Sequence, residues 1–238
     1  MTASDNTTSR ERQLQFAAGA VSLGCGLAAV LTVLISLGQW WVEPAPRASL
    51  AGVTSASAEP PEPVTDGETY VQTRILPSGE LVVTQWIESS RLLFGVTLDL
   101  PRVAGMEVLT AEHVQVVANG RNAVGPKRIS SGQQSTYAFL GTSSVRIRYR
   151  LTGAVELSPS VPGRALARLT ALDVTYEPAS AQVTRTVTAP EVLSLACSAP
   201  AQAFETRPCG DRVSKGEWTV DLSGPQVDDR VMAQLTLE

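Results

Sequence analysis

Residues 144–151 read SVRIRYRL, and this is the clearest β-strand pattern in the chain. Apolar side chains occupy every second position, and three arginines stand between them. Successive side chains of a strand point to opposite faces of the sheet, so a period of two is typical of a half-buried strand. We therefore expect one face to lie on a hydrophobic core and the other to carry the arginines; the apolar face would be Val145, Ile147, Tyr149 and Leu151.

Similar alternation recurs on both sides of this strand. Residues 70–76 and 80–87 alternate and are joined by Pro77-Ser78-Gly79, which predicts a hairpin because proline and glycine favour the dihedrals of a tight turn. Residues 113–118 end at Asn119-Gly120, another strong turn signal. Short strands separated by such turns predict an antiparallel β-sandwich over residues 69–238. Further strands are expected at 172–176, 182–188, 218–222 and 231–237, while Leu166, Leu169 and Leu172 also fit helical spacing.

Far upstream of these strands, residues 13–42 carry no formal charge and are mostly apolar. A membrane-spanning helix needs roughly 20 apolar residues, so this stretch is long enough to cross a bilayer. Trp40 and Trp41 would sit among the lipid headgroups as interface anchors. A cleavable signal peptide is the alternative, but its apolar stretch would be shorter, and the Ala56-Ser57-Ala58 pattern lies well downstream. We expect one transmembrane helix that contacts the lipid bilayer through residues 13–42.

Positive charge near the span predicts its orientation. Arg10 and Arg12 precede it, whereas Arg47 alone follows and is offset by Glu43. Residues 1–12 would then form a cytoplasmic tail, 43–68 a Pro/Ala/Ser-rich linker, and 69–238 a domain outside the cell membrane. Lysine occurs only at Lys127 and Lys215, while arginine, alanine, proline and glycine are frequent, which suggests a high-GC bacterium.

Two cysteines support the extracytoplasmic assignment. Cys197 and Cys209 enclose a short loop that contains prolines but neither a histidine nor a third cysteine. A disulfide between them would persist only in an oxidising compartment. Two free cysteines in the core are the alternative.

Charge and composition argue against several classes of function. The formal net charge is −4, whereas a protein that binds nucleic acid usually carries clustered positive charge. The single histidine, His113, cannot build a multi-histidine zinc site, and no G-x-S-x-G marks a nucleophilic serine. Asp228-Asp229 is expected to be a solvated loop. The residues thus predict no catalytic group, no metal site and no cofactor, and we lean against an enzyme.

The arginines of 144–151 are the strongest candidate binding feature. Arg146, Arg148 and Arg150 would project from one sheet surface at intervals of roughly 7 Å. Such a row can hold phosphate, a teichoic-type polymer or an acidic partner through bidentate hydrogen bonds. The ordinary alternative is a solvated strand face balanced by acids on neighbouring strands.

Short motifs give one family resemblance. Residues 70–101 contain Leu81, Val83 and Thr84 in an L-x-V-T pattern, residues 147–154 read IRYRLTGA, and Pro190 precedes Cys197 in a late strand. In these respects the chain resembles the extracytoplasmic β domain of YciQ-like predicted membrane proteins. It departs from them at Gln85, where a glutamate is usual, and it lacks their tryptophan-containing segment and the further membrane helices usual in relatives. The resemblance implies an envelope-facing β domain of unknown role and no enzymatic activity.

These observations predict a membrane-anchored extracytoplasmic β domain that acts as a non-catalytic interaction module. Its partner would be another envelope protein or an anionic envelope polymer. The alternative function is an envelope hydrolase whose acidic residues meet only in the fold. Such an enzyme should show a concave pocket of a few hundred cubic ångströms with converging carboxylates or with His113.

Overall fold

The computed structural model describes residues 59–102, 109–169, 171–200 and 205–237. The chain divides into two units, residues 1–53 and 54–238, and all of the described residues belong to the second. The predicted tail, the transmembrane segment with Trp40 and Trp41, and most of the linker lie outside the described residues. Within the described part, no helix is long and apolar enough to cross a membrane.

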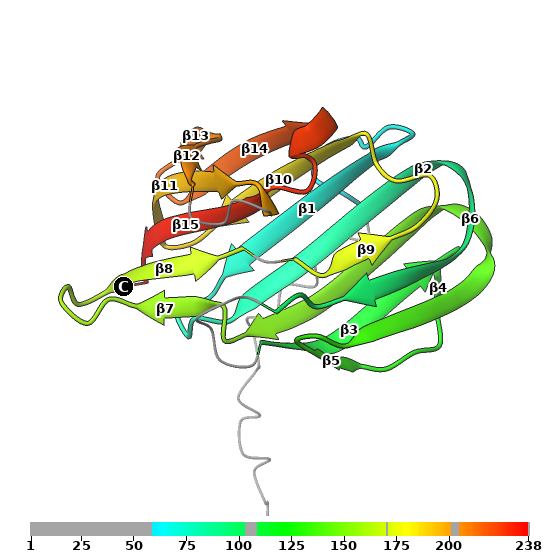
Figure 1. The fold of residues 1–238 in the computed structure, drawn as a ribbon, viewed down its shortest axis with the longest axis horizontal. Helices are drawn as coiled ribbons and strands as arrows, with labels where there is room; N and C mark the ends of the chain where they lie inside the picture. Colours follow the sequence, from blue (N-terminus) through cyan, green and yellow to red (C-terminus); the bar gives the residue numbers. More distant parts are fainter. Residues whose placement is uncertain (1–58, 103–108, 170, 201–204, 238) are drawn as a thin grey trace, which may run out of the picture. The chain divides into compact units, whose positions relative to one another are not determined.

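A large sheet holds most of the strands (Figure 1). Its ten strands run in the order β13-β14-β10-β1-β2-β6-β3-β4, with β5 paired to β3 and β9 paired to β2. The strands β2 and β6 are the longest, and their pairing occupies the middle of the sheet. The bounds are β1 Glu68–Ile75, β2 Leu81–Asp99, β3 Thr110–Ala118, β4 Arg121–Asn122, β5 Arg128–Ser130, β6 Gln134–Thr152, β9 Asp173–Thr175, β10 Gln182–Thr188, β13 Asp211–Ser214 and β14 Glu217–Ser223.

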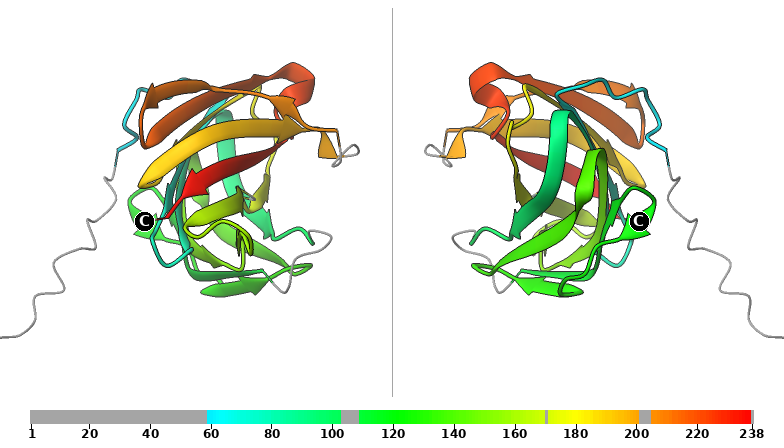
Figure 2. Two further views of the ribbon diagram at one scale, coloured as in Figure 1. Left: turned by 90° about the vertical axis from the view of Figure 1, so that its left-hand side faces the viewer. Right: turned by 90° about the vertical axis from the view of Figure 1, so that its right-hand side faces the viewer.

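A smaller sheet has five strands in the order β12-β11-β15-β8-β7. Figure 2 shows β11 and β15 on one side of the domain and β2 and β6 on the other. A short 3-10 helix, η2 (Gly224–Gln226), leads into β15. The bounds are β7 Val155–Leu157, β8 Arg164–Arg168, β11 Glu191–Ser198, β12 Arg207–Pro208 and β15 Arg230–Thr236.

Both sheets contribute to one hydrophobic core. Alternation along each strand sends every second side chain inward, so Ile147 and Leu151 of β6 belong to the same buried cluster as Leu195 of β11 and Leu235 of β15. The protein is therefore mainly β with two sheets, as the alternation predicted.

The predicted turns are confirmed. Gly79 has a φ of 82° and its N–H donates to the Leu76 carbonyl, which closes the hairpin between β1 and β2. Asn119 and Gly120 both have positive φ, 52° and 68°, as a two-residue hairpin turn requires. Leu166, Leu169 and Leu172 also fitted helical spacing, but the described residues between 166 and 172 contain the end of β8 and no helix.

One pairing departs from the predicted antiparallel arrangement. The strands β1 and β10 run parallel, with Tyr70 opposite Thr184 and Arg74 opposite Thr188. A parallel pair needs a long connection, and here the strands β2 to β9 lie between β1 and β10 in the sequence. The strand β10 then pairs with the edge of β1 that β2 leaves free. The large sheet is thus mixed.

Candidate functional site

The three predicted arginines lie together on the outer face of the large sheet. Arg146, Arg148 and Arg150 are half-buried, and the residues between them on β6 are buried in the core. The strand pattern of 144–151 is therefore confirmed on both faces.

The neighbouring strands place few acids beside this row. Arg148 lies between Thr84 of β2 and Gln115 of β3. Arg150 has Glu112 opposite it on β3, but the Glu112 carboxylate pairs with Arg128 at 3.6 Å. Among the described carboxylates, none forms an ion pair with Arg148 or Arg150. The cross-strand neutralisation that an ordinary solvated face would show is absent at these two positions.

A fourth arginine extends the row toward β1. Arg74 lies opposite Val82, which in turn lies opposite Arg150. The Arg74 Nε is buried and has no hydrogen-bond partner among the described residues. Burial lowers the pKa of the Arg148 guanidinium, and the positive charges of Arg146, Arg74 and Arg150 lower it further. We call Arg74, Arg146, Arg148 and Arg150 the arginine face.

A hollow of about 280 Å³ opens beside the arginine face, and His113 lines it together with Gln115, Arg148 and Arg150. His113 is exposed and has a φ of 54°, where the pairing of β3 with β6 shifts register between Glu112 and Gln115. Such bulges redirect side chains. The sequence carries a signal for this bulge, because the buried residues Ala111 and Val114 are three positions apart instead of two.

An aromatic pair lies on the same outer face. Tyr70 of β1 and Trp86 of β2 pack edge to face with ring centroids 5.8 Å apart, and both are buried. The Tyr70 hydroxyl hydrogen-bonds Thr186 of β10. Trp86 lies opposite Arg146 across the β2–β6 pair, so the aromatic pair borders the arginine face.

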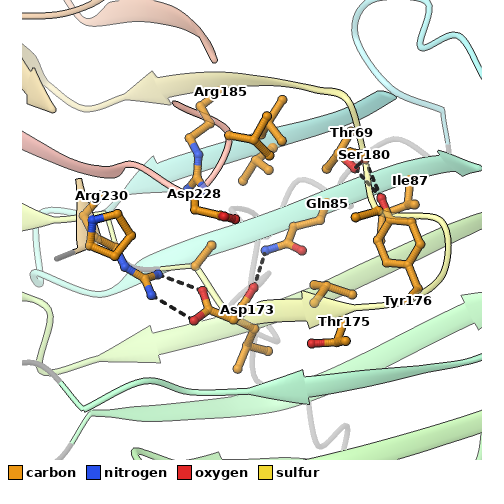
Figure 3. A pocket seen from close by; sticks show the side chains of 18 residues that line it. Thr69, Gln85, Ile87, Asp173, Thr175, Tyr176, Ser180, Arg185, Asp228 and Arg230 are labelled. Atoms are coloured by element: carbon orange, nitrogen blue, oxygen red, sulfur yellow. Dashed lines mark hydrogen bonds and ion pairs between the residues drawn. The ribbon is translucent and has the colours of Figure 1, made fainter. Parts of the chain in front are cut away.

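On the inner side of the sheet lies a second cavity, of about 360 Å³ (Figure 3). Arg230 donates two hydrogen bonds to the Asp173 carboxylate, at 2.7 and 2.9 Å. The Gln85 amide donates to the Leu172 carbonyl at 3.4 Å and to the Tyr149 hydroxyl at 3.3 Å. Arg185 of β10 also lines this cavity, and its Nε is buried without a partner among the described residues.

This cavity meets only part of what a hydrolase would need. Two carboxylates, Asp173 and Asp228, line it. Both oxygens of Asp173 are already engaged by Arg230, and Asp228 is exposed. His113 lines the outer hollow instead. Within the described ranges, no three histidine, cysteine or acidic side chains gather as metal ligands would.

The two predicted cysteines form a disulfide, with their Cα atoms 5.8 Å apart. It ties β11 to the residue that follows β12. Nearby, one expectation is wrong. Asp229 is only 3% exposed and pairs with Arg207, so it is a buried structural acid, whereas Asp228 is solvated as expected.

Comparisons with known proteins give distant similarities only. No family model and no curated protein matches the chain. An aminopeptidase N family protein from Idiomarina loihiensis aligns over 70% of this chain and 29% of its own, at 10% identity and a TM-score of 0.42. Yeast LTA4 hydrolase in complex with bestatin aligns over 74% of this chain and 31% of its own, at 13% identity and a TM-score of 0.42. An M1 zinc metallopeptidase from Deinococcus radiodurans has 15% identity over 70% of this chain and 40% of its own, with a TM-score of 0.29.

The chain therefore spans less than a third of the length of the first two of these proteins.

Proposed function

We propose that this protein is a non-catalytic interaction module of the bacterial cell envelope, held at the membrane by residues 13–42. The uncharged apolar run supports the anchor, with Trp40 and Trp41 as its interface residues. The Cys197–Cys209 disulfide supports an oxidising, extracytoplasmic location for residues 69–238. The two sheets around a common core support a β-sandwich for that domain.

The ligand that we propose for the arginine face is an anionic polymer of the envelope. The observation that carries this proposal is the setting of Arg148. It has an arginine two positions away on either side, Thr84 and Gln115 across the strands, and no paired acid among the described residues. Arg148 is thus repelled by the arginines beside it with no ion pair of its own to a described carboxylate, and a bound polyanion would relieve that repulsion.

The geometry favours a repeating anion over a single one. Guanidinium groups two residues apart on a strand project at roughly 7 Å intervals. Each can form two parallel hydrogen bonds with a phosphate group, which lysine cannot reproduce. A chain of phosphate groups that runs along β6 would contact the arginines in succession.

The test measures retention of the full-length chain, in detergent micelles, on immobilised poly(glycerol phosphate). The variant is the triple substitution Arg146→Gln, Arg148→Gln and Arg150→Gln. The control is Arg121→Gln, Arg164→Gln and Arg212→Gln, three exposed arginines on β4, β8 and β13 that change the net charge equally. We expect at least tenfold weaker retention for the first variant, near-normal retention for the control, and weaker wild-type retention as salt increases.

Equal retention of both triple variants would remove the arginine face from the proposal. If the wild-type chain is not retained at all, the polymer is the wrong ligand; crosslinking in native membranes would then identify a protein neighbour. Protease added to intact cells tests the location separately, because the proposal requires it to cleave within residues 69–238.

A further inference from the structure

Arg185 places a positive charge on the core side of the large sheet. On β10 it lies between Val183 and Val187, both buried, and its cross-strand neighbours are Val71 of β1 and Val220 of β14. Burying a charged group without a hydrogen-bonding partner is costly. The Arg185 Nε nevertheless has no acceptor among the described residues.

The acids around Arg185 do not neutralise it. Asp173 is occupied by Arg230, and Asp228 stands exposed without an ion pair to Arg185. Burial lowers the pKa of the Arg185 guanidinium; the nearby positive charge of Arg230 lowers it further, while Tyr149, Asp173 and Asp228 raise it. The half-buried Arg185 side chain therefore lines the cavity with a buried Nε whose hydrogen-bonding capacity is unused among the described residues.

The cavity has the size and the lining of a small-molecule site. Its volume of about 360 Å³ lies within the usual range for ligand pockets. The apolar part of the wall is formed by Val71, Ile87 and Leu172. Polar groups around it come from Thr69, Gln85 and Ser180. Figure 3 shows Arg185 and Arg230 coming from one side of this space and Gln85, Tyr176 and Ser180 from the other.

We propose that this cavity binds a small organic carboxylate, whose anionic group pairs with Arg185 and whose apolar part contacts Val71, Ile87 and Leu172. The ligand supplies the acceptor that the Arg185 guanidinium lacks. A single negative charge fits better than a phosphate dianion, because Asp173 and Asp228 line the same space and would repel additional charge.

This site is independent of the proposed polymer binding. Arg185 and the arginine face lie on opposite faces of the large sheet, since Arg185 stands opposite Val71 whereas Arg74 faces outward with Val82 and Arg150. Loss of one function therefore leaves the other intact.

The test compares a carboxylate with its neutral isostere. Isothermal titration of the full-length chain in detergent micelles would use 3-phenylpropionate and 3-phenylpropionamide, with acetate as a minimal carboxylate. We expect the wild-type chain to bind 3-phenylpropionate about tenfold to a hundredfold more tightly than the amide, the range for a hydrogen-bonded charge pair.

Two variants locate the preference. Arg185→Met keeps an extended apolar side chain and removes the positive charge with its unpaired Nε, so we expect it to fold at least as stably as the wild type and to lose the preference for the carboxylate. Arg121→Met, an exposed control on β4, should keep the preference. The Arg185→Gln variant is a second test if the methionine variant does not fold.

Three results would overturn the proposal. The first is that the wild-type chain binds no carboxylate at millimolar concentration, and the second is that it binds the acid and the amide equally. The third is that the Arg185 variants keep the preference for the acid. Normal binding of 3-phenylpropionate by the Arg146, Arg148 and Arg150 triple variant would show that the two sites are separate.

Discussion

The substitution Arg148→Gln removes the central charge of the arginine face, and we expect it to raise the free energy of unfolding. In most proteins the loss of a half-buried arginine is neutral or destabilising, because an ion pair or the packing of its stem is lost. Arg148 differs because it forms no ion pair with a described carboxylate and stands between two arginines on its own strand.

The expected magnitude follows from Coulomb's law. Each neighbouring arginine lies roughly 7 Å away along β6, a separation at which two like charges in water repel by about 0.6 kcal/mol. Two such neighbours destabilise the folded domain by roughly 1 kcal/mol at low salt. At 0.15 M salt, screening over about 8 Å reduces this to about half. The variant also loses some packing of the Arg148 stem against the sheet, which lowers its stability and offsets part of this gain.

Urea unfolding of the full-length chain in detergent, followed by tryptophan fluorescence at several salt concentrations, measures the effect. The variant should be more stable than the wild type by up to about 1 kcal/mol at low salt, and the difference should shrink as salt rises. Arg121→Gln is the control and should change little. A variant that is less stable than the wild type at every salt concentration would contradict this account of the arginine face.

Three further predictions concern the rest of the domain. Reduction of the Cys197–Cys209 disulfide, whose cysteines are 12 residues apart, should cost roughly 3 kcal/mol in urea unfolding by the chain-entropy model; no change on reduction would refute this. Burial raises the pKa of Tyr149 above its usual value, so the folded state keeps a proton that the unfolded state loses. Above about pH 10 stability should therefore fall by up to about 1.4 kcal/mol per pH unit for this phenol, and Tyr149→Phe should flatten the fall. Gly210→Ala should destabilise the domain more than Gly224→Ala, since both glycines have positive φ but only at Gly210 would a Cβ lie 2.5 Å from a carbonyl oxygen, that of Thr219; equal melting temperatures would contradict this.

The sequence predicted best those strands whose alternation is uninterrupted. Residues 144–151 and 182–188 fall on β6 and β10 because one face of each meets the core. The second half of β2 was missed, since register shifts between Glu88 and Gly95 break its alternation and leave Leu92 and Phe94 exposed. The first half of β6 was missed for the related reason that it pairs with this irregular part of β2.

The candidate site was predicted only in part. Alternation alone placed Arg146, Arg148 and Arg150 on one surface. Arg74 joins them through the register of β1 with β2 and of β2 with β6, which no local pattern encodes. Arg185 lies on the strand predicted at residues 182–188, but the cavity that it lines depends on residues more than 100 positions apart, such as Thr69 and Asp173. The membrane anchor stays a prediction from the apolar run.

The parallel pairing of β1 with β10 has a consequence for biosynthesis. One edge of β1 can pair with β2 as soon as the hairpin has been synthesised. The other edge stays unpaired until residues 182–188 of β10 follow, more than a hundred residues later. At about 5–20 residues per second, a ribosome takes on the order of ten seconds to supply them. During that interval the nascent chain exposes an unpaired strand edge, which is a template for aggregation. A chaperone that binds this edge as the polypeptide emerges would therefore raise the yield of correctly folded protein.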